Sequence, residues 1–132
     1  MPKSLTRRSA AVLAAGVLSF GVGAPLAHAG DGEVRTNGTC SNGATWKLKA
    51  KPDNGRIEVE FEVDTNRNGQ TWGVVLRDNG TLVYRGTHTT VAPSGSFSVE
   101  RRIANRAGTD VITARATHAS GAVCSGRLSF PG

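Results

Sequence analysis

Two histidines in the second half of the chain have serines close by and could support nucleophilic catalysis. His88 precedes Ser94 and Ser96, and His118 precedes Ser120. A serine activated by a neighbouring histidine is the minimal form of such a site. Neither segment has the Gly-x-Ser-x-Gly pattern of a nucleophile elbow, and serine is common in turns because its hydroxyl bonds to nearby backbone. We therefore expect turns and no enzyme, with His88 and His118 as the residues that an enzymatic alternative would need.

An oxygen-rich hexapeptide, Asp-Thr-Asn-Arg-Asn-Gly from Asp64 to Gly69, matches the start of a calcium-binding loop. Alternate oxygen ligands converge on the ion in such a loop, and the glycine permits a sharp turn. The twelfth position is Val75 instead of the bidentate glutamate, and Arg67 would repel a cation. A polar turn explains the segment equally well, so we expect no metal ion and no cofactor.

The acidic residues Glu58, Glu60 and Glu62 also suggest a metal or acid–base site. However, Asn54-Gly55 is a strong signal for a two-residue hairpin turn. Folding the chain about this turn places a lysine opposite each glutamate: Lys51 with Glu58, Lys49 with Glu60, and Lys47 with Glu62. The other face then pairs Ala50 with Val59, Leu48 with Phe61, and Trp46 with Val63. A slip by one residue would put charges into the core, so we interpret the acidic run as a solvated ladder of ion pairs.

Cys40 and Cys124 are the two cysteines of the chain. An even number of cysteines in an exported protein indicates a disulfide, whereas a thiol or metal site needs a reducing compartment or more ligands. The bond would close a long loop and stabilise the fold by about 4 kcal/mol in the chain-entropy model. We therefore predict a structural disulfide between Cys40 and Cys124.

Residues 1–29 have the features of a secretory signal peptide. Lys3, Arg7 and Arg8 precede an uncharged apolar stretch, and Ala27-His28-Ala29 predicts cleavage between Ala29 and Gly30. Removing these residues leaves 103 residues and lowers the formal net charge from +6 to +3. We expect a secreted, extracellular domain over residues 30–132, with no membrane anchor and no nucleic-acid partner.

The remainder consists of short runs of alternating apolar and polar residues between turn signals, which predicts an all-β domain of seven or eight strands. The expected strands are 33–40 at an edge, then 45–51, 56–63, 71–77, 81–87, 96–103, 110–117 and 123–130. With Trp72 on the third main strand and the run Asp110-x-Ile112-x-Ala114-x-Ala116, the pattern resembles an immunoglobulin-like or fibronectin type III β-sandwich. It also resembles small secreted actinobacterial proteins of unassigned function. The resemblance implies two packed sheets and no mechanism.

A two-sheet arrangement predicts which side chains face outward. We expect strands 45–51, 56–63 and 96–103 in one sheet, and 71–77, 81–87, 110–117 and 123–130 in the other. Alternation along the second sheet places Arg77, Tyr84, Arg115 and Arg127 on its outer face with no acidic residue to neutralise them. Arginine and tyrosine are enriched in protein interfaces, so these four residues are the candidate partner-binding site.

The leading hypothesis from the sequence is a non-enzymatic extracellular module that binds a protein or cell-surface partner through this face. The alternative is an inhibitor of a secreted hydrolase that acts through an exposed loop, either residues 88–94 or residues 64–70. A sugar-binding platform is less favoured, because all tryptophans and phenylalanines beyond residue 29 fall on inward phases of their strands.

Overall fold

A computed structural model of the protein describes residues 27–29 and 32–132. The strands are β1 (Ala27–Ala29), β2 (Glu33–Thr39), β3 (Thr45–Asp53), β4 (Arg56–Asp64), β5 (Thr71–Asp78), β6 (Thr81–Thr89), β7 (Ser96–Ala104), β8 (Asp110–His118) and β9 (Val123–Phe130). No helix among the described residues is long and apolar enough to cross a membrane.

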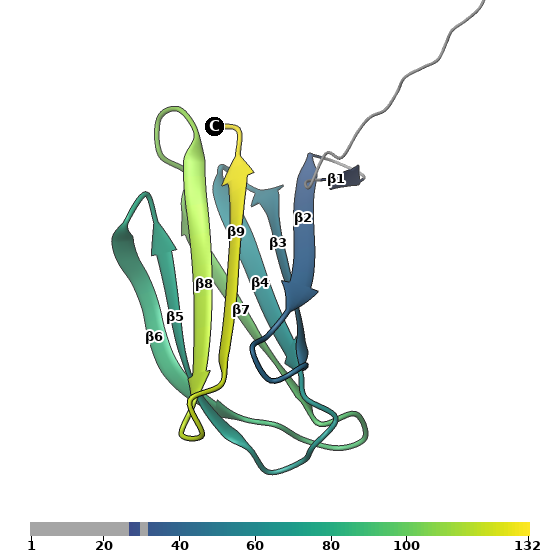
Figure 1. Cartoon of the computed structure of the whole chain (residues 1–132). Helices are drawn as coiled ribbons and strands as arrows, with labels where there is room; N and C mark the ends of the chain where they lie inside the picture. Colours follow the sequence, from purple (N-terminus) through teal and green to yellow (C-terminus); the bar gives the residue numbers. More distant parts are fainter. Residues whose placement is uncertain (1–26, 30–31) are drawn as a thin grey trace, which may run out of the picture.

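The strands form two antiparallel sheets that pack face to face (Figure 1). The first sheet has the order β2-β3-β4-β7, with the three-residue β1 added at its edge beside β2. The second sheet has the order β6-β5-β8-β9. This arrangement confirms the predicted all-β sandwich and the predicted division of the strands between its sheets.

The β3–β4 hairpin has the register that its sequence predicts. Lys47, Lys49 and Lys51 lie opposite Glu62, Glu60 and Glu58, respectively. Asn54 and Gly55 form the turn with φ values of 51° and 79°, the left-handed conformations that a tight hairpin turn requires. The local sequence therefore fixes which face of the first sheet enters the core.

The core consists of the inner faces of both sheets. Trp72 and Phe61 are fully buried, and Trp46, Phe97 and Phe130 are nearly so. These aromatics point inward as predicted, which leaves none of them as a sugar-binding platform.

Gly38 of β2 and Gly126 of β9 leave room for the Trp46 indole, since a Cβ at either position would lie within 2.7 Å of the ring. Asn37-Gly38, an Asn-Gly pair that taken alone predicts a turn, does not form one. Both residues pair with β3, and a glycine is required at position 38 because a side chain there would collide with the Trp46 ring.

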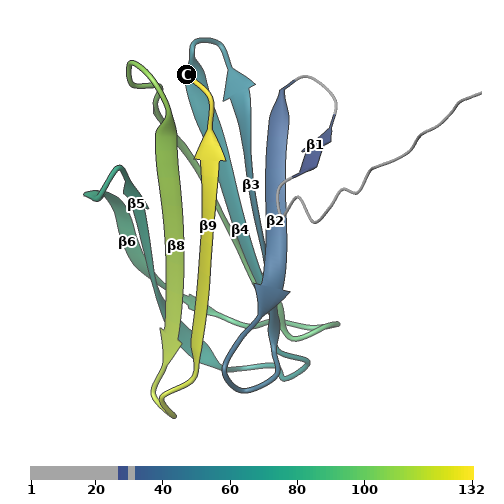
Figure 2. The ribbon, with the colours of Figure 1, turned by 45° about the horizontal axis from the view of Figure 1, so that its top comes forward.

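The predicted disulfide is present between Cys40 and Cys124, with an S–S distance of 2.09 Å. It joins the end of β2 to β9 and so connects the two sheets where their edges lie side by side (Figure 2). Next to it, the Ser41 amide donates to the Val123 carbonyl at 2.9 Å, and the Val123 amide donates to Ser41 Oγ at 2.9 Å. The disulfide indicates an oxidising compartment.

The predicted signal peptide falls largely outside the described residues. This applies to residues 1–26 and to Gly30 of the predicted cleavage site. Its last three residues form β1, with His28 opposite Val34 of β2. Cleavage after Ala29 remains a prediction.

Candidate functional site: the outer face of the second sheet

Three of the four candidate residues lie together on the outer face of the second sheet. Arg77, Arg115 and Arg127 are exposed, on β5, β8 and β9, respectively. Arg77 lies opposite Thr113 of β8, and Thr113 lies opposite Arg127 of β9. Arg115 lies two residues further along β8, opposite Val75. The three arginines therefore share one surface, as their spacing predicts.

The prediction that Tyr84 lies on this face is wrong. β6 contains a β-bulge, in which Leu82 pairs with Arg77, Tyr84 pairs with Leu76, and Val83 is the extra residue. Because Leu76 is fully buried, Tyr84 opposite it points to the inner side. The bulge reverses the alternation beyond Val83 and turns Arg85 outward, opposite Val75. Sequence reasoning missed Arg85, because simple alternation gives no signal for a bulge.

Tyr84 instead closes the open side of the sandwich between β6 and β7. Its hydroxyl lies 2.7 Å from His88 Nε2, and the Arg101 guanidinium of β7 lies 4.7 Å from the centre of its ring. The His88 ring stacks on Phe97 of β7 at 5.5 Å. The tyrosine passes over Gly86, where a Cβ would collide with the tyrosine hydroxyl. These contacts give Tyr84 and His88 a structural role at the edge of the core.

Four exposed arginines thus cross the second sheet, one on each strand. In order across the sheet they are Arg85 of β6, Arg77 of β5, Arg115 of β8 and Arg127 of β9. Each is the diagonal neighbour of the next, a relation that places side chains about 7–8 Å apart. We call this set the arginine row.

The arginine row is not neutralised by neighbouring carboxylates. None of its members forms an ion pair with a described residue, and Arg77 only donates to the Gly80 carbonyl at 3.4 Å. The two aspartates within the strands of this sheet, Asp78 and Asp110, are fully buried on the inner side. The outer face of the second sheet therefore carries a net positive charge.

A hollow of about 360 Å³ lies beside the arginine row. Gly73 of β5 contributes no side chain here. Arg85, Thr87, Arg115 and Thr117 surround the gap, together with Val75, which lies between the two arginines. Thr87 and Thr117 lie opposite Gly73 on its two neighbouring strands. Two arginines and two hydroxyls around a small gap can donate hydrogen bonds to an anionic group.

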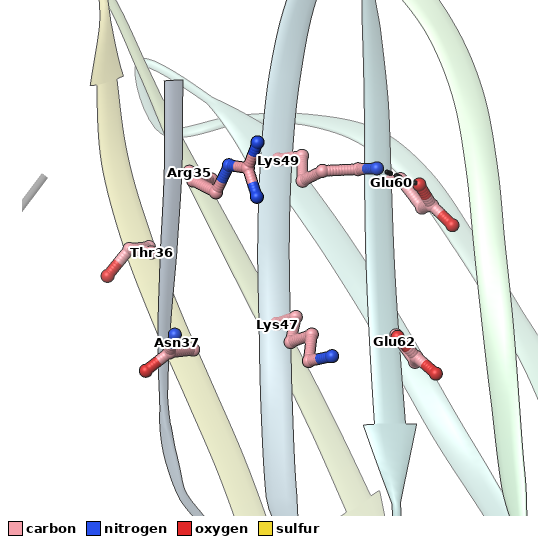
Figure 3. A pocket seen from close by; sticks show the side chains of 7 residues that line it. All are labelled: Arg35, Thr36, Asn37, Lys47, Lys49, Glu60 and Glu62. Carbon is pink, nitrogen blue, oxygen red and sulfur yellow. Dashed lines mark ion pairs between the residues drawn. The ribbon is translucent and has the colours of Figure 1, made fainter. Parts of the chain in front are cut away.

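The outer face of the first sheet is the opposite case. Four ion pairs lie on it: Arg35–Glu33, Lys49–Glu60, Lys51–Glu58 and Arg102–Asp53. A hollow of about 340 Å³ also lies on this face, and Figure 3 shows Lys47 and Lys49 extending from β3 toward Glu62 and Glu60 of β4. The Lys49–Glu60 distance is 3.0 Å, and this contact raises the pKa of Lys49. The charges on the outer face of the first sheet therefore largely neutralise one another.

Glu100 of β7 is a carboxylate of this face that the hairpin alone did not predict. It lies opposite Glu60 and beside Glu58. Contact with the Glu58 carboxyl raises the pKa of Glu100, and the same contact lowers the pKa of Glu58. The first sheet thus gains negative charge, which increases the contrast with the arginine row.

The loops proposed for hydrolase inhibition form one hydrogen-bonded unit. The Thr65 amide donates to the Gly95 carbonyl at 2.9 Å, and the Thr90 amide donates to the Gln70 carbonyl at 2.8 Å. The nearly buried Thr90 hydroxyl donates to the Arg67 carbonyl and accepts from the Gln70 amide. Segments 64–70 and 88–94, together with Gly95 directly after the second, therefore support each other at one end of the sandwich.

The calcium-like segment uses its oxygens within this loop unit. Asp64 Oδ1 accepts from the Asn66 amide at 3.2 Å, and the Thr65 hydroxyl lies 2.9 and 2.8 Å from the Arg67 and Gly95 carbonyl oxygens, which share its one proton. Asn66 and Gly69 have positive φ values of 63° and 81°. These are the bonds of a polar turn. Within residues 27–29 and 32–132, no three His, Cys, Asp or Glu side chains cluster as metal ligands.

His118 is the last residue of β8, directly before the turn to β9. Its Nδ1 is 2.9 Å from Ser120 Oγ and accepts from the Ser120 amide at 3.2 Å, while its ring packs 5.2 Å from that of Trp72. The Ser120 hydroxyl also accepts from the Ala122 amide at 3.3 Å. The serine and histidine are thus both bound to turn backbone, which explains their proximity without catalysis.

Comparison with known proteins finds no family model and no curated protein that matches the chain.

Proposed function

We propose that the protein is a non-enzymatic, secreted binding module whose outer face on the second sheet binds an acidic partner at the cell surface or outside the cell. The observation that carries the proposal is the arginine row, four exposed cations without an ion-pair partner among the described residues. Charged surfaces that are not internally neutralised attract opposite charge and accelerate association.

The contrast between the two outer faces supports this proposal. If arginine served only solubility, we would expect both faces to carry similar mixtures of charge. Instead, four of the five ion pairs among the described residues lie on the first sheet, and the fifth joins Arg106 to the buried Asp78. The Cys40–Cys124 disulfide supports the proposed export, because such bonds persist in oxidising compartments.

A charge-matched pair of variants tests the proposal. We expect Arg77→Ser/Arg85→Ser/Arg115→Ser to lose partners that the disulfide-intact protein captures from culture fluid and envelope fractions. The control, Arg35→Ser/Arg56→Ser/Arg102→Ser, removes the same charge from the first sheet and should retain them. Thermal melts check that both proteins are folded, since exposed ion pairs contribute about 1 kcal/mol or less. Equal capture by both variants would refute the proposal.

Inhibition of a secreted hydrolase is the second candidate, favoured by the mutual support of segments 64–70 and 88–94. Val91 is 59% exposed at the tip of the second segment. Its amide and carbonyl are held by Ser96 and Gly95 at 2.9–3.2 Å. A preorganised tip loses little conformational entropy when it enters a cleft. Stoichiometric titration against secreted proteases and glycosidases, with Val91→Asp as the variant expected to fail, tests this candidate.

The integrity of the loop unit depends on the Thr90 hydroxyl. We expect Thr90→Val to lower the free energy of unfolding by about 1–3 kcal/mol, because the Gln70 amide and the Arg67 carbonyl lose a buried partner. Thr90→Ser keeps the hydroxyl and should remain close to the parent. Denaturant unfolding and hydrogen exchange at the Gln70 amide measure the effect. Parent-like stability of Thr90→Val would show that the two segments do not depend on this residue.

A further inference from the structure

We infer that the ligand of the arginine row is a linear polymer of polyol units joined by phosphodiester bonds, and that the hollow at Gly73 holds one of its phosphates. This inference rests on the proposed function and names the chemistry of the partner. The arrangement of the cations, the donors around the hollow and the composition of the face each support it.

The arrangement of the cations favours a linear ligand. Arg85, Arg77, Arg115 and Arg127 follow one another across the full width of the second sheet. Their regular diagonal spacing of about 7–8 Å presents a line of charge instead of a single cluster. A phosphodiester polymer carries one charge in each repeat and is flexible, so successive phosphates can reach successive guanidinium groups.

The donors favour phosphate. Guanidinium groups bind phosphate oxygens through two parallel hydrogen bonds, and hydroxyls add further donors. The hollow provides both types, with Arg85 and Arg115 in one cross-strand row and Thr87 and Thr117 in the next. Gly73 keeps the space between them open, because a Cβ there would already contact Thr117 Oγ1 at 3.6 Å.

The rest of the face disfavours a protein or a nucleic acid as the ligand. With Tyr84 turned inward, the outer-face positions of β5, β6, β8 and β9 carry no aromatic side chain. Protein interfaces usually contain aromatic anchors at their centre, and single-stranded nucleic acids stack their bases on aromatic rings. Besides the arginines, hydroxyl side chains outnumber aliphatic ones at the outward positions of this face: Thr71, Thr87, Thr89, Thr113, Thr117, Ser125 and Ser129 against Val75, Leu82, Val111 and Val123. Such a surface suits a hydrated polyol chain.

Fluorescence anisotropy with three labelled probes tests the inference on the full, disulfide-intact protein. The probes are poly(glycerol phosphate), oligothymidylate of equal charge and polyglutamate of equal charge. We expect poly(glycerol phosphate) to bind most tightly. The dependence of log K on log salt should decrease by about 0.7 for each arginine of the row that is changed to serine, the value known for flexible single strands. Arg56→Ser, on the first sheet, should leave affinity and salt dependence unchanged.

A variant that fills the hollow tests whether a phosphate binds at this specific site or is attracted only by the overall positive charge of the face. Gly73→Val should weaken poly(glycerol phosphate) binding by about tenfold or more, the order expected for losing charge-assisted hydrogen bonds, without changing net charge. Ser129→Val, at the far edge of the same face, is the matched control. Thermal melts confirm that both variants fold. Unchanged affinity of Gly73→Val would refute the seat at Gly73.

The outcomes distinguish this inference from the proposed function. Equal or tighter binding of polyglutamate or oligothymidylate, still dependent on the arginine row, would overturn the polyol-phosphate ligand and leave an acidic-ligand module standing. If none of the three probes binds but partner capture still needs the arginine row, the polyol-phosphate ligand is likewise overturned and the acidic-ligand module stands. If capture also survives the loss of the row, both proposals fail.

Discussion

Replacement of both cysteines, Cys40→Ala/Cys124→Ala, is expected to cost about 4–5 kcal/mol of folding free energy. The disulfide joins residues separated by 84 positions, and the chain-entropy model gives this value for a loop of that length. A domain of this size typically has only 5–15 kcal/mol of stability. The melting temperature should fall by about 20 °C or more, as calorimetry or circular dichroism can measure.

Reduction of the unmodified protein provides the control for this prediction. Reductant should lower its melting temperature to nearly that of the double variant and should not affect the double variant itself. If neither the double substitution nor reduction changed the melting temperature, β2 would be held to β9 by packing and by the Ser41–Val123 hydrogen bonds alone.

Asp78→Asn is expected to stabilise the protein at neutral pH, by about 2 kcal/mol. Asp78 is fully buried on the inner side of the second sheet. Burial, followed by the neighbouring Asp110 carboxyl, raises the pKa of Asp78 from 3.8 to about 6, although Arg106 at 3.4 Å acts in the opposite direction. Two pKa units correspond to about 3 kcal/mol, a value in which the opposing attraction to Arg106 is already included, and we expect the variant to recover most of it.

The raised pKa also determines how stability depends on pH. Between about pH 4 and pH 6 the folded protein retains a proton on Asp78 that the unfolded chain has released. Stability from this group is therefore fully present below pH 4 and is lost as pH rises through 6. Denaturant unfolding at pH 4, 5, 6 and 7 should show this decline in the parent protein and a flatter profile in Asp78→Asn.

Asp53→Asn is the matched control for this experiment. Asp53 forms an exposed ion pair with Arg102 at 2.9 Å on the first sheet, and its removal should change stability by less than about 1 kcal/mol. If Asp78→Asn instead destabilised the protein at pH 7, the ionised carboxylate and Arg106 would be a net favourable pair, and the prediction would be wrong.

Much of the fold was predictable because its local signals agree. At Asn54-Gly55, the turn residues, the Lys/Glu pairs and the apolar pairs all require the same register. Features that depend on distant contacts were not predictable. Asn37-Gly38 has the sequence of a turn, yet it lies within β2 because the Trp46 indole needs the space above Gly38.

The candidate site was predictable only where alternation is unbroken. Arg77, Arg115 and Arg127 were found because β5, β8 and β9 alternate regularly. Alternation predicted Tyr84 on the outer face and did not predict Arg85 there. The bulge that places Arg85 outside and Tyr84 inside has no signal in the sequence near Val83. The burial of Asp78 was also missed, since it directly precedes the Asn79-Gly80 turn, where a polar residue would normally be solvated.

The bulge at Val83 has a consequence for comparing this chain with relatives. On β6 the outward residue before the bulge is even-numbered, Leu82, whereas Arg85, Thr87 and Thr89 after it are odd-numbered. Deletion of Val83 would restore regular pairing and leave Leu82 outward opposite Arg77, Tyr84 inward opposite Leu76 and Arg85 outward opposite Val75. The same residues paired without a bulge would instead bring Tyr84 to the surface and turn Arg85 inward. The bulge thus accommodates one extra residue on β6 without removing an arginine from the charged face, and we expect a relative with a one-residue gap at this position to keep that face.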